Sequence, residues 1–374
     1  MKRFCGYIAG FIFFISGILK LMDPVGTSLV MKEYFQFLHL GFMDFSAMAA
    51  GIFFSFAECT IGTGLITGVW RKIMASIAIG FQGLFTFLTL LLVTFNPKMD
   101  CGCFGEAIHL THGETFIKNL LLLALLLIYY IPARHLGVTK KKKYVSFGIV
   151  TVSMVAFAAY SLTYLPLNDY TDFHAGVNLK SEGSEAETYQ AVFTYEKEGV
   201  QKTFTIDNLP DNSWTFVSTE TVMTNETGGD SATLSFSDEN GVYADSLALK
   251  GKVIIISVYD TDLKKKETEN IAAFIKRAED AGFKPLLLSA SEMGLPHYIA
   301  DYKTLITLNR SNGGATYIND GFIAGKWAKK TLPSQDELAK LSQEDVTESI
   351  IGNSRSSLAF QGFLLYVFAV MLLL

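Results

Sequence analysis

Two cysteines separated by a single residue are the strongest chemical signal in this sequence. Cys101 and Cys103 lie in the segment Asp-Cys-Gly-Cys-Phe-Gly, residues 100–105. A disulfide between them would close a small, strained ring, and strained disulfides are more oxidising and exchange more readily. Gly102 and Gly105 supply the backbone freedom that such a ring needs. The spacing therefore favours thiol–disulfide exchange over structural stapling.

Other interpretations of this segment remain open. The pair could be a static loop staple, or two free thiols that pack at the membrane surface. His109 and His112 follow in the pattern Cys-x-Cys-x5-His-x2-His, and mixed Cys/His ligands suit zinc or copper. Thr111 and Glu114 have the spacing of a capping box, however, so His112 is also explained as a residue at a helix start.

The elements that must position this segment are membrane helices. The chain has 374 residues, of which 50% are hydrophobic and 18% charged, whereas soluble domains average about 25% charged residues. A bilayer-spanning helix needs about 20 apolar residues. Five such runs precede residue 166, and a shorter sixth ends the sequence: Phe4–Met22, Ser46–Val69, Ile73–Phe95, Phe116–Ile131, Val145–Leu165 and Leu358–Leu374.

Basic residues in the short loops predict the orientation. Lys2/Arg3, Arg71/Lys72 and the group Arg134 with Lys140–Lys143 fall on one side if the spans alternate, which is typical of cytoplasmic loops. The first run lacks a small-x-small cleavage site, so we expect it to be a retained span. Both termini are then cytoplasmic and residues 166–355 extracytoplasmic, where disulfides persist. The net charge of −5 argues against a nucleic-acid partner.

Glu58 lies in the middle of the second span. A carboxylate in lipid is costly and by default marks a functional or paired site, so Glu58 is a candidate proton relay or a structural hydrogen-bonding group. Lys20 and Asp23, at the outer end of the first span, are expected to be too shallow to pair with it. Cys59 is expected to be a packing residue, with a resolving role left open, and Cys5 to be inert.

Three motifs in order resemble the MauE/DoxX family of small bacterial membrane proteins, over about residues 4–135. The first is Gly17–Pro24, which matches the family's G-x-x-K-x-x-D-P ending. The second is Ala57–Leu65 with Gly68, and the third is residues 100–105 followed by Glu114–Asn119. The resemblance implies a four-helix membrane bundle. MauE-like members are linked to methylamine dehydrogenase maturation by supporting disulfide formation, and DoxX-like members to quinone-linked electron transfer. A quinone is thus a candidate cofactor.

The residues after the fifth span predict two soluble units. Alternating stretches at Tyr189–Tyr195, Thr203–Ile206 and Trp214–Thr219, separated by turn residues such as Asn208–Ser213, predict an antiparallel β unit. After Gly228-Gly229 the pattern becomes hairpin, strand, helix, strand, hairpin and helix, which is a thioredoxin-like order. The expected elements are Leu234–Gly241, Val253–Val258, Glu267–Ala281, Pro285–Ser289, Thr316–Ile318 with Phe322–Trp327, and Ser334–Leu341.

The lead-in Leu249–Ser257 resembles the TlpA branch of thioredoxin-like proteins, over about residues 230–345. Where that family carries its Cys-x-x-Cys pair, this chain has Leu263–Lys266, and Gly313–Ala315 stands in place of its cis-proline. The sequence contains no cysteine after Cys103. Exchange requires a thiolate, so this domain is expected to be redox-inactive and to serve as a docking module.

The predicted fold class is an α-helical membrane bundle, with a four-helix MauE/DoxX-like core plus two further spans, and an extracytoplasmic α/β thioredoxin-like domain. The expected segments are a membrane domain at 1–135, a fifth helix at 144–165, a β-rich segment at 166–228, the thioredoxin-like domain at 229–345 and a terminal helix at 357–374.

The predicted function is that of a bacterial inner-membrane protein that supports thiol–disulfide or electron-transfer chemistry, or the maturation of extracytoplasmic proteins, through Cys101 and Cys103. Its partners would be membrane lipid and an extracytoplasmic protein held by residues 166–355. The alternative is a non-enzymatic membrane-anchored scaffold. A transporter is a weaker option, because Glu58 is the one charged residue at a central span position.

Overall fold

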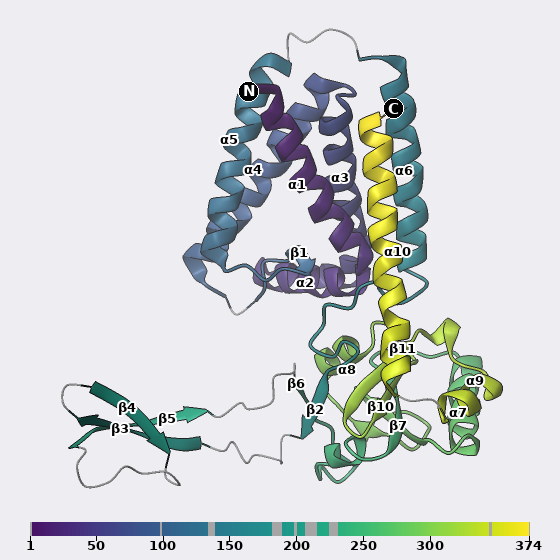
Figure 1. Ribbon diagram of the computed structural model, residues 1–374. Coiled ribbons are helices and arrows are strands. Elements are labelled where there is room, and N and C mark those ends of the chain that lie inside the picture. The colour runs from purple at the N-terminus through teal and green to yellow at the C-terminus, as the bar shows by residue number, and fades with distance from the viewer. Residues whose placement is uncertain are drawn as a thin grey trace.

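The computed structural model describes residues 2–97, 99–133, 139–181, 189–197, 200–205, 215–223, 231–343 and 346–373. Arg134, the expected turn at Asn208–Ser213 and the Gly228-Gly229 boundary lie outside these residues. The described chain forms a bundle of long helices at one end and sheet-containing units at the other, as Figure 1 shows. The arrangement confirms the predicted class, a membrane helical core with an α/β domain.

Five helices of the bundle are long and apolar enough to cross a membrane. They are α1 Lys2–Met22, α3 Ala47–Thr67, α4 Arg71–Phe95, α5 His112–Ala133 and α6 Lys141–Ser161. Small residues bring α1 and α3 together, because an added Cβ at Gly17 or Gly62 would lie 2.6 Å from backbone atoms of the facing helix. Such close approach is a common way to associate helices where lipid weakens the hydrophobic effect.

The C-terminal helix α10, Val346–Leu373, packs along the same bundle (Figure 1). The Lys143 ammonium donates to the Met371 carbonyl at 3.0 Å, and the Ser146 hydroxyl donates to the Val370 carbonyl at 2.8 Å. The ring of Phe157 stacks on Phe363 with centroids 4.8 Å apart. Its apolar part, Leu358–Leu373, is shorter than the other five candidate spans, so a sixth span stays a prediction.

A short helix that the sequence analysis treated as loop lies across the end of the bundle. This is α2, Pro24–Phe37, which is followed by the 3-10 turn η1, Gly41–Ser46. The Asp23 carboxylate accepts from the Gly26 N–H at 2.9 Å, and Pro24 occupies the first helical position. An Asp N-cap followed by Pro is a strong helix start. The cysteine segment, with its strand β1 Cys103–Glu106, lies beside α2.

The larger soluble unit is built on a seven-stranded sheet of order β6-β2-β11-β10-β7-β8-β9. Strands β7 and β8 are parallel and are joined by α7, while β10 and β11 form an antiparallel hairpin. This strand–helix–strand and hairpin order confirms the thioredoxin-like prediction. The element bounds are β2 Asn178–Ser181, β6 Ser231–Leu234, η3 Asp245–Ala248, β7 Lys252–Val258, α7 Lys265–Asp280, β8 Lys284–Ser289, β9 Tyr298–Ile299, α8 Tyr302–Leu308, β10 Gly314–Asn319, β11 Phe322–Trp327, η4 Lys329–Thr331 and α9 Gln335–Leu341.

Two cores hold this unit together, one on each face of the sheet. Residues 253–258 of β7 are buried throughout, as a central strand covered on both faces requires. On one face, Ile271, Phe274 and Ala278 of α7 pack against the sheet. The helix α8, which the sequence analysis did not expect, begins at the N-cap Asp301 and contributes Leu305 and Leu308 to the core on the other face.

The remaining strands form a separate three-stranded antiparallel sheet, with β3 between β4 and β5. Their bounds are β3 Tyr189–Lys197, β4 Val200–Thr205 and β5 Thr215–Met223. The antiparallel pairing agrees with the expected β unit. Strand β2, in contrast, pairs with β11 and β6 of the large sheet. The expected 166–228 segment is therefore divided, and β3–β5 stand as an insertion between β2 and β6 (Figure 1).

Candidate functional site

The cysteine segment is held against the end of the bundle by α1 and α2. The Tyr34 hydroxyl of α2 donates to the Cys101 carbonyl at 3.1 Å, and the Ser16 hydroxyl of α1 lies 2.5 Å from the Cys103 carbonyl. Gly102 has φ +60°, and an added Cβ there would lie 2.4 Å from Val30 of α2. Glycine is thus required at this position both by its backbone conformation and by its contact with α2.

The two cysteines differ in accessibility. Cys101 is 6% exposed, whereas Cys103 is half-buried, and both are thiols in this structure. Burial raises the pKa of the Cys101 thiol above its usual range, because removal from water penalises the thiolate. Cys103 is therefore the more accessible of the two thiols.

Glu58 forms a buried ion pair with Lys20. The Lys20 ammonium lies 2.7 Å from Glu58 Oε1, and these side chains are 10% and 6% exposed. The Ser16 hydroxyl donates to Glu58 Oε2 at 2.8 Å. The expectation that Lys20 lies too shallow was wrong, because Ser16 and Lys20 are one turn apart on the same face of α1. The long stem of Lys20 carries its charge back to Glu58.

A pocket that is partly open to solvent joins the cysteines to this ion pair. Cys101, Cys103, Glu58 and Lys20 all line it. Its walls are mainly apolar and aromatic, and several uncharged polar side chains stand among them: Ile12, Phe13, Val30, Phe54, Phe85 and Leu122, with Ser16, Thr27, Tyr34, Ser55, Gln82, Thr89 and Asn119. A mainly apolar lining with a few convergent polar groups is typical of small-molecule sites.

The histidines of the metal interpretation have other partners. The ring nitrogens of His112 lie 2.9 Å from the Met99 carbonyl and 3.3 Å from Asn96 Oδ1. His109 is exposed and lies 3.7 Å from the Asp100 carboxylate. Among the described residues, no three His, Cys, Asp or Glu side chains converge as metal ligands would. The capping box expected before α5 is present, since Glu114 Oε2 accepts from the Thr111 N–H at 2.9 Å.

Cys59 is enclosed between α1 and α3, away from solvent. It is 1% exposed, and its Sγ lies 3.9 Å from the Phe14 carbonyl. An added Cβ at Gly17 would approach this sulfur to 2.7 Å. The surroundings agree with the expected packing role.

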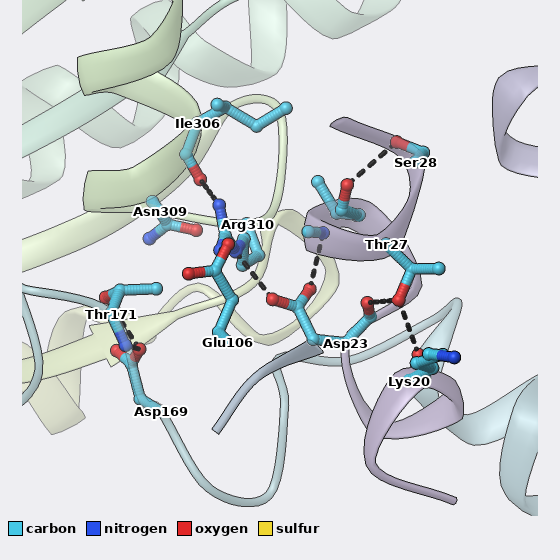
Figure 2. A network of polar contacts seen from close by, with 12 residues as sticks. Lys20, Asp23, Thr27, Ser28, Glu106, Asp169, Thr171, Ile306, Asn309 and Arg310 are labelled. Carbon is cyan, nitrogen blue, oxygen red and sulfur yellow. Dashed lines mark hydrogen bonds and ion pairs between the residues drawn. The ribbon is translucent and has the colours of Figure 1, made fainter. Parts of the chain in front are cut away.

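Arg310 of the thioredoxin-like unit is a residue that the sequence analysis missed (Figure 2). It follows α8 and donates through Nε to Asp23 at 2.9 Å and through Nη2 to Glu106 at 2.9 Å. Nη1 donates to the Ile306 carbonyl at 3.1 Å. The Arg310 side chain is 4% exposed, so the charges are largely desolvated. Burial raises the pKa of Glu106 despite the neighbouring guanidinium. Asp23, at the end of the G-x-x-K-x-x-D-P motif, was the one available signal.

In the thioredoxin-like unit, the loop after β7 and the loop before β10 are hydrogen-bonded to each other. Asn312 Oδ1 accepts from the N–H groups of Tyr259 and Asp260 at 2.9 and 3.1 Å, and its Nδ2 donates to the Asp260 carbonyl at 2.8 Å. The Tyr259 hydroxyl donates to the Arg310 carbonyl at 3.0 Å. The loop after β7 and the loop before β10 therefore form one unit that contains no thiol.

Comparison with known proteins agrees with this division of the chain. The family model described as methylamine utilisation protein MauE matches residues 2–132. The part of the bundle formed by α1, α3, α4 and α5 is MauE-like. The cysteine segment and Glu58 both fall inside this MauE-like region, whereas Arg310 reaches it from outside.

A curated relative supports the connection between the MauE-like region and a thioredoxin-like portion. Protein TlpB of Flavobacterium psychrophilum is 26% identical over 174 residues, which cover 44% of this chain and 45% of that protein. The chain thus spans less than half of that relative's length. A model described as a domain of unknown function, DUF8463, matches residues 189–226, the β3–β5 insertion. No solved structure matches the chain.

Proposed function

We propose that this membrane protein is a thiol–disulfide component of the bacterial inner membrane that supports the maturation of extracytoplasmic proteins. Cys101 and Cys103 would be its redox pair. The observation that carries this proposal is the shared cavity, in which both cysteines lie beside the Glu58–Lys20 ion pair and apolar walls. The MauE-like bundle and the TlpB relative favour the same chemistry.

The exchange step follows from the difference in exposure between the two thiols. With Cys101 and Cys103 joined as a disulfide, a partner thiolate attacks the more accessible Cys103 sulfur and Cys101 leaves as a thiolate. A second partner thiolate then attacks the partner sulfur of the mixed disulfide and releases Cys103. The partner is oxidised by two electrons and forms a disulfide, and the cysteine pair is reduced to two thiols.

A quinone is the proposed electron acceptor. The lining residues support this class, because Phe54 and Phe85 are aromatic while Lys20, Gln82 and Asn119 carry hydrogen-bond donors. When bound, a quinone would accept the two electrons and two protons released as the cysteine pair returns to a disulfide.

The proposed relay for the protons is Glu58. Ser16 connects it to the cysteine segment, since the Ser16 hydroxyl lies within hydrogen-bond distance of both Glu58 and the Cys103 carbonyl.

The proposed topology has six spans, cytoplasmic termini and a periplasmic soluble domain. Figure 1 supports it, because the cysteine segment, α2 and the soluble units lie at one end of the bundle. Both termini of the drawn chain lie at the other end. The basic run Lys140–Lys143, which favours the cytoplasm, precedes and opens α6 at the same end as the termini.

The decisive experiment replaces the redox pair in the intact chain. We expect Cys101→Ser/Cys103→Ser to increase the reduced fraction of envelope proteins in thiol trapping, because no thiolate remains at the cavity mouth. Cys5→Ser is the matched control, since it removes a cysteine near the opposite end of α1. A disulfide profile unchanged by the double substitution would contradict the proposal.

A scaffold function is the second candidate. It is favoured by the thioredoxin-like unit itself, which carries no cysteine and whose loops are bonded through Asn312. A scaffold would retain its partners in pull-downs from cells carrying Cys101→Ser/Cys103→Ser, and those partners would keep their normal disulfides. Partners whose disulfides are lost in the same variant identify the redox function instead.

A further inference from the structure

Arg310 connects the thioredoxin-like unit directly to the cysteine segment. We propose that Arg310 is a positioning residue for Cys101 and Cys103, and that the thioredoxin-like unit acts on this pair within the same chain. The inference rests on the proposed function only in taking the two thiols as the reactive groups. It assigns the domain a task beyond recruiting an outside protein.

The first arm of the contact runs through Glu106. Glu106 ends β1, three residues after Cys103, and its carboxylate receives Arg310 Nη2 at 2.9 Å. Ser16 and Tyr34 hold the Cys103 and Cys101 carbonyls from the bundle side. The Arg310–Glu106 bond therefore fastens the C-terminal end of a segment whose other contacts come from the membrane helices.

The second arm runs through Asp23. Asp23 joins α1 to α2 and caps α2 by accepting from the Gly26 N–H at 2.9 Å. The same helix carries Val30, which lies so close to Gly102 that an added Cβ at that glycine would clash with it. It also carries Tyr34, whose hydroxyl donates to the Cys101 carbonyl. Arg310 thus holds both the strand that begins at Cys103 and the helix against which the cysteine segment packs.

The loop that carries Arg310 is itself constrained. The Tyr259 hydroxyl bonds the Arg310 carbonyl, and Asn312 ties this loop to the loop after β7. The guanidinium also bonds the carbonyl of Ile306 in α8. A side chain fixed at its own backbone and buried between two carboxylates transmits the position of the domain to its partners. The Arg310 side chain points at Asp23 and Glu106 of the MauE-like region (Figure 2).

The test measures the thiols of the full-length chain in lipid nanodiscs. Two readouts are used: the alkylation rate of each cysteine, and the equilibrium constant of the pair in glutathione buffers. The variants are Arg310→Ala, Arg310→Lys and Glu106→Gln. Glu106→Gln removes the charge that attracts Arg310 Nη2 while leaving Arg310 paired with Asp23, so it remains informative if Arg310→Ala does not fold.

Lys303→Ala is the matched control. Lys303 pairs with Glu33 of α2 across the same interface at 3.4 Å, but its side chain is 71% exposed. Removing it weakens the contact between α8 and α2 without touching β1 or Asp23. If the reactivity of the thiols responds to any loosening of the contact between α8 and α2, it will change in this variant. If it responds to the bonds from Arg310 to Asp23 and Glu106, it will stay at the wild-type value.

We expect Arg310→Ala to raise the Cys101 alkylation rate by about tenfold, since local opening governs access to a buried thiol. Glu106→Gln should give a smaller rise in the same direction, and both should shift the glutathione equilibrium. Arg310→Lys should fall between Arg310→Ala and wild type, because one ammonium cannot reproduce the fork that spans two carboxylates.

Two outcomes would overturn the proposal. One is wild-type rates and equilibria in folded Arg310→Ala and in Glu106→Gln. The other is an equal change in Lys303→Ala. Both readouts use small reagents on the purified chain, so they stay valid if no envelope protein depends on the pair. Failure of the proposed function is thereby distinguishable from failure of this inference.

Discussion

The MauE-like bundle and the thioredoxin-like unit place their polar groups in opposite ways. The bundle buries Glu58, Lys20 and a cysteine inside an apolar environment. The thioredoxin-like unit has an apolar core of ordinary composition, and the loops at its expected redox position carry no cysteine. The fold that suggests thiol chemistry has no cysteine, whereas the MauE-like region contains all four. Chemistry in this chain follows the placement of side chains and not the name of the fold.

The largest expected effect would test whether the bundle depends on its buried charges. Glu58→Ala leaves the Lys20 ammonium buried without its carboxylate, and losing one partner of such a pair costs about 3–5 kcal/mol. We expect the folded fraction in a detergent denaturation series to fall accordingly. Lys20→Met/Glu58→Leu, which removes both charges, should recover most of the loss.

The same measurement in the soluble unit provides the contrast. Lys329 and Glu267 form an ion pair whose side chains are about one-third exposed. Lys329→Ala should cost less than about 1 kcal/mol, because water replaces the lost partner. Two results would contradict the expected difference between buried and exposed ion pairs. One is a Glu58→Ala variant as stable as the double variant, and the other is a loss of stability in Lys329→Ala as large as that in Glu58→Ala.

The next effect separates the two cysteines. Cys101→Ser leaves the accessible Cys103 able to form a mixed disulfide with the disulfide of an oxidised partner, but removes the neighbouring thiol that could attack Cys103 and release that partner. Cys103→Ser leaves the buried Cys101 alone. We expect at least about ten times more trapped mixed disulfide with Cys101→Ser, because access limits exchange. Non-reducing gels after acid quenching measure this ratio. Equal trapping would mean that exposure does not assign the roles.

The pH dependence of alkylation sharpens the same assignment. Burial raises the pKa of Cys101 above the ordinary value of 9.0, so at pH 8 a smaller fraction of it is thiolate. Its alkylation rate should keep rising about tenfold per pH unit through pH 9, where an ordinary thiol begins to level off. Stopped alkylation followed by peptide mass spectrometry gives the profile. A plateau below pH 9 would contradict the burial argument.

The smallest expected effect tests the independence of the soluble unit from the site. Ser334 caps α9 by accepting from the Glu337 N–H, and Glu337 bonds the Ser334 N–H at 2.7 Å in return. Ser334→Ala should cost about 1 kcal/mol. Faster hydrogen exchange of α9 amides would show it, with unchanged alkylation of Cys101 and Cys103. A change in thiol reactivity would mean that α9 contributes to the positioning assigned to Arg310.

Local patterns predicted most of the elements. The five long apolar runs became helices, and the alternating and apolar stretches became β3–β5, β7, β8, β10 and β11, because burial requirements are written in the periodicity of side chains. The α2 helix was missed, since Pro24, Gly26 and a length too short to span a membrane resemble a loop when the Asp23 cap is not recognised. The short helix α8 was missed for a similar reason.

The candidate site was predicted in parts. Cys101, Cys103 and Glu58 were recognised from their types and positions, but their common cavity was not. The Lys20–Glu58 pair was rejected from depth along the span, because a one-dimensional estimate ignores how far a lysine side chain extends. Arg310 gave no local signal at all, since its partners Asp23 and Glu106 lie more than 200 residues away in the chain.

The sequence by itself determined what this protein is made of: membrane helices, a thioredoxin-like unit without thiols, and all four cysteines within the first 103 residues. These properties depend on composition and on short-range periodicity, which a chain carries locally. The tertiary structure alone decided which groups meet, joining Cys103 to Ser16, Ser16 to Glu58, and Glu106 to Arg310. These contacts depend on close packing between segments that are distant in the chain. A shift of one helix by a single turn would give each of its side chains different partners.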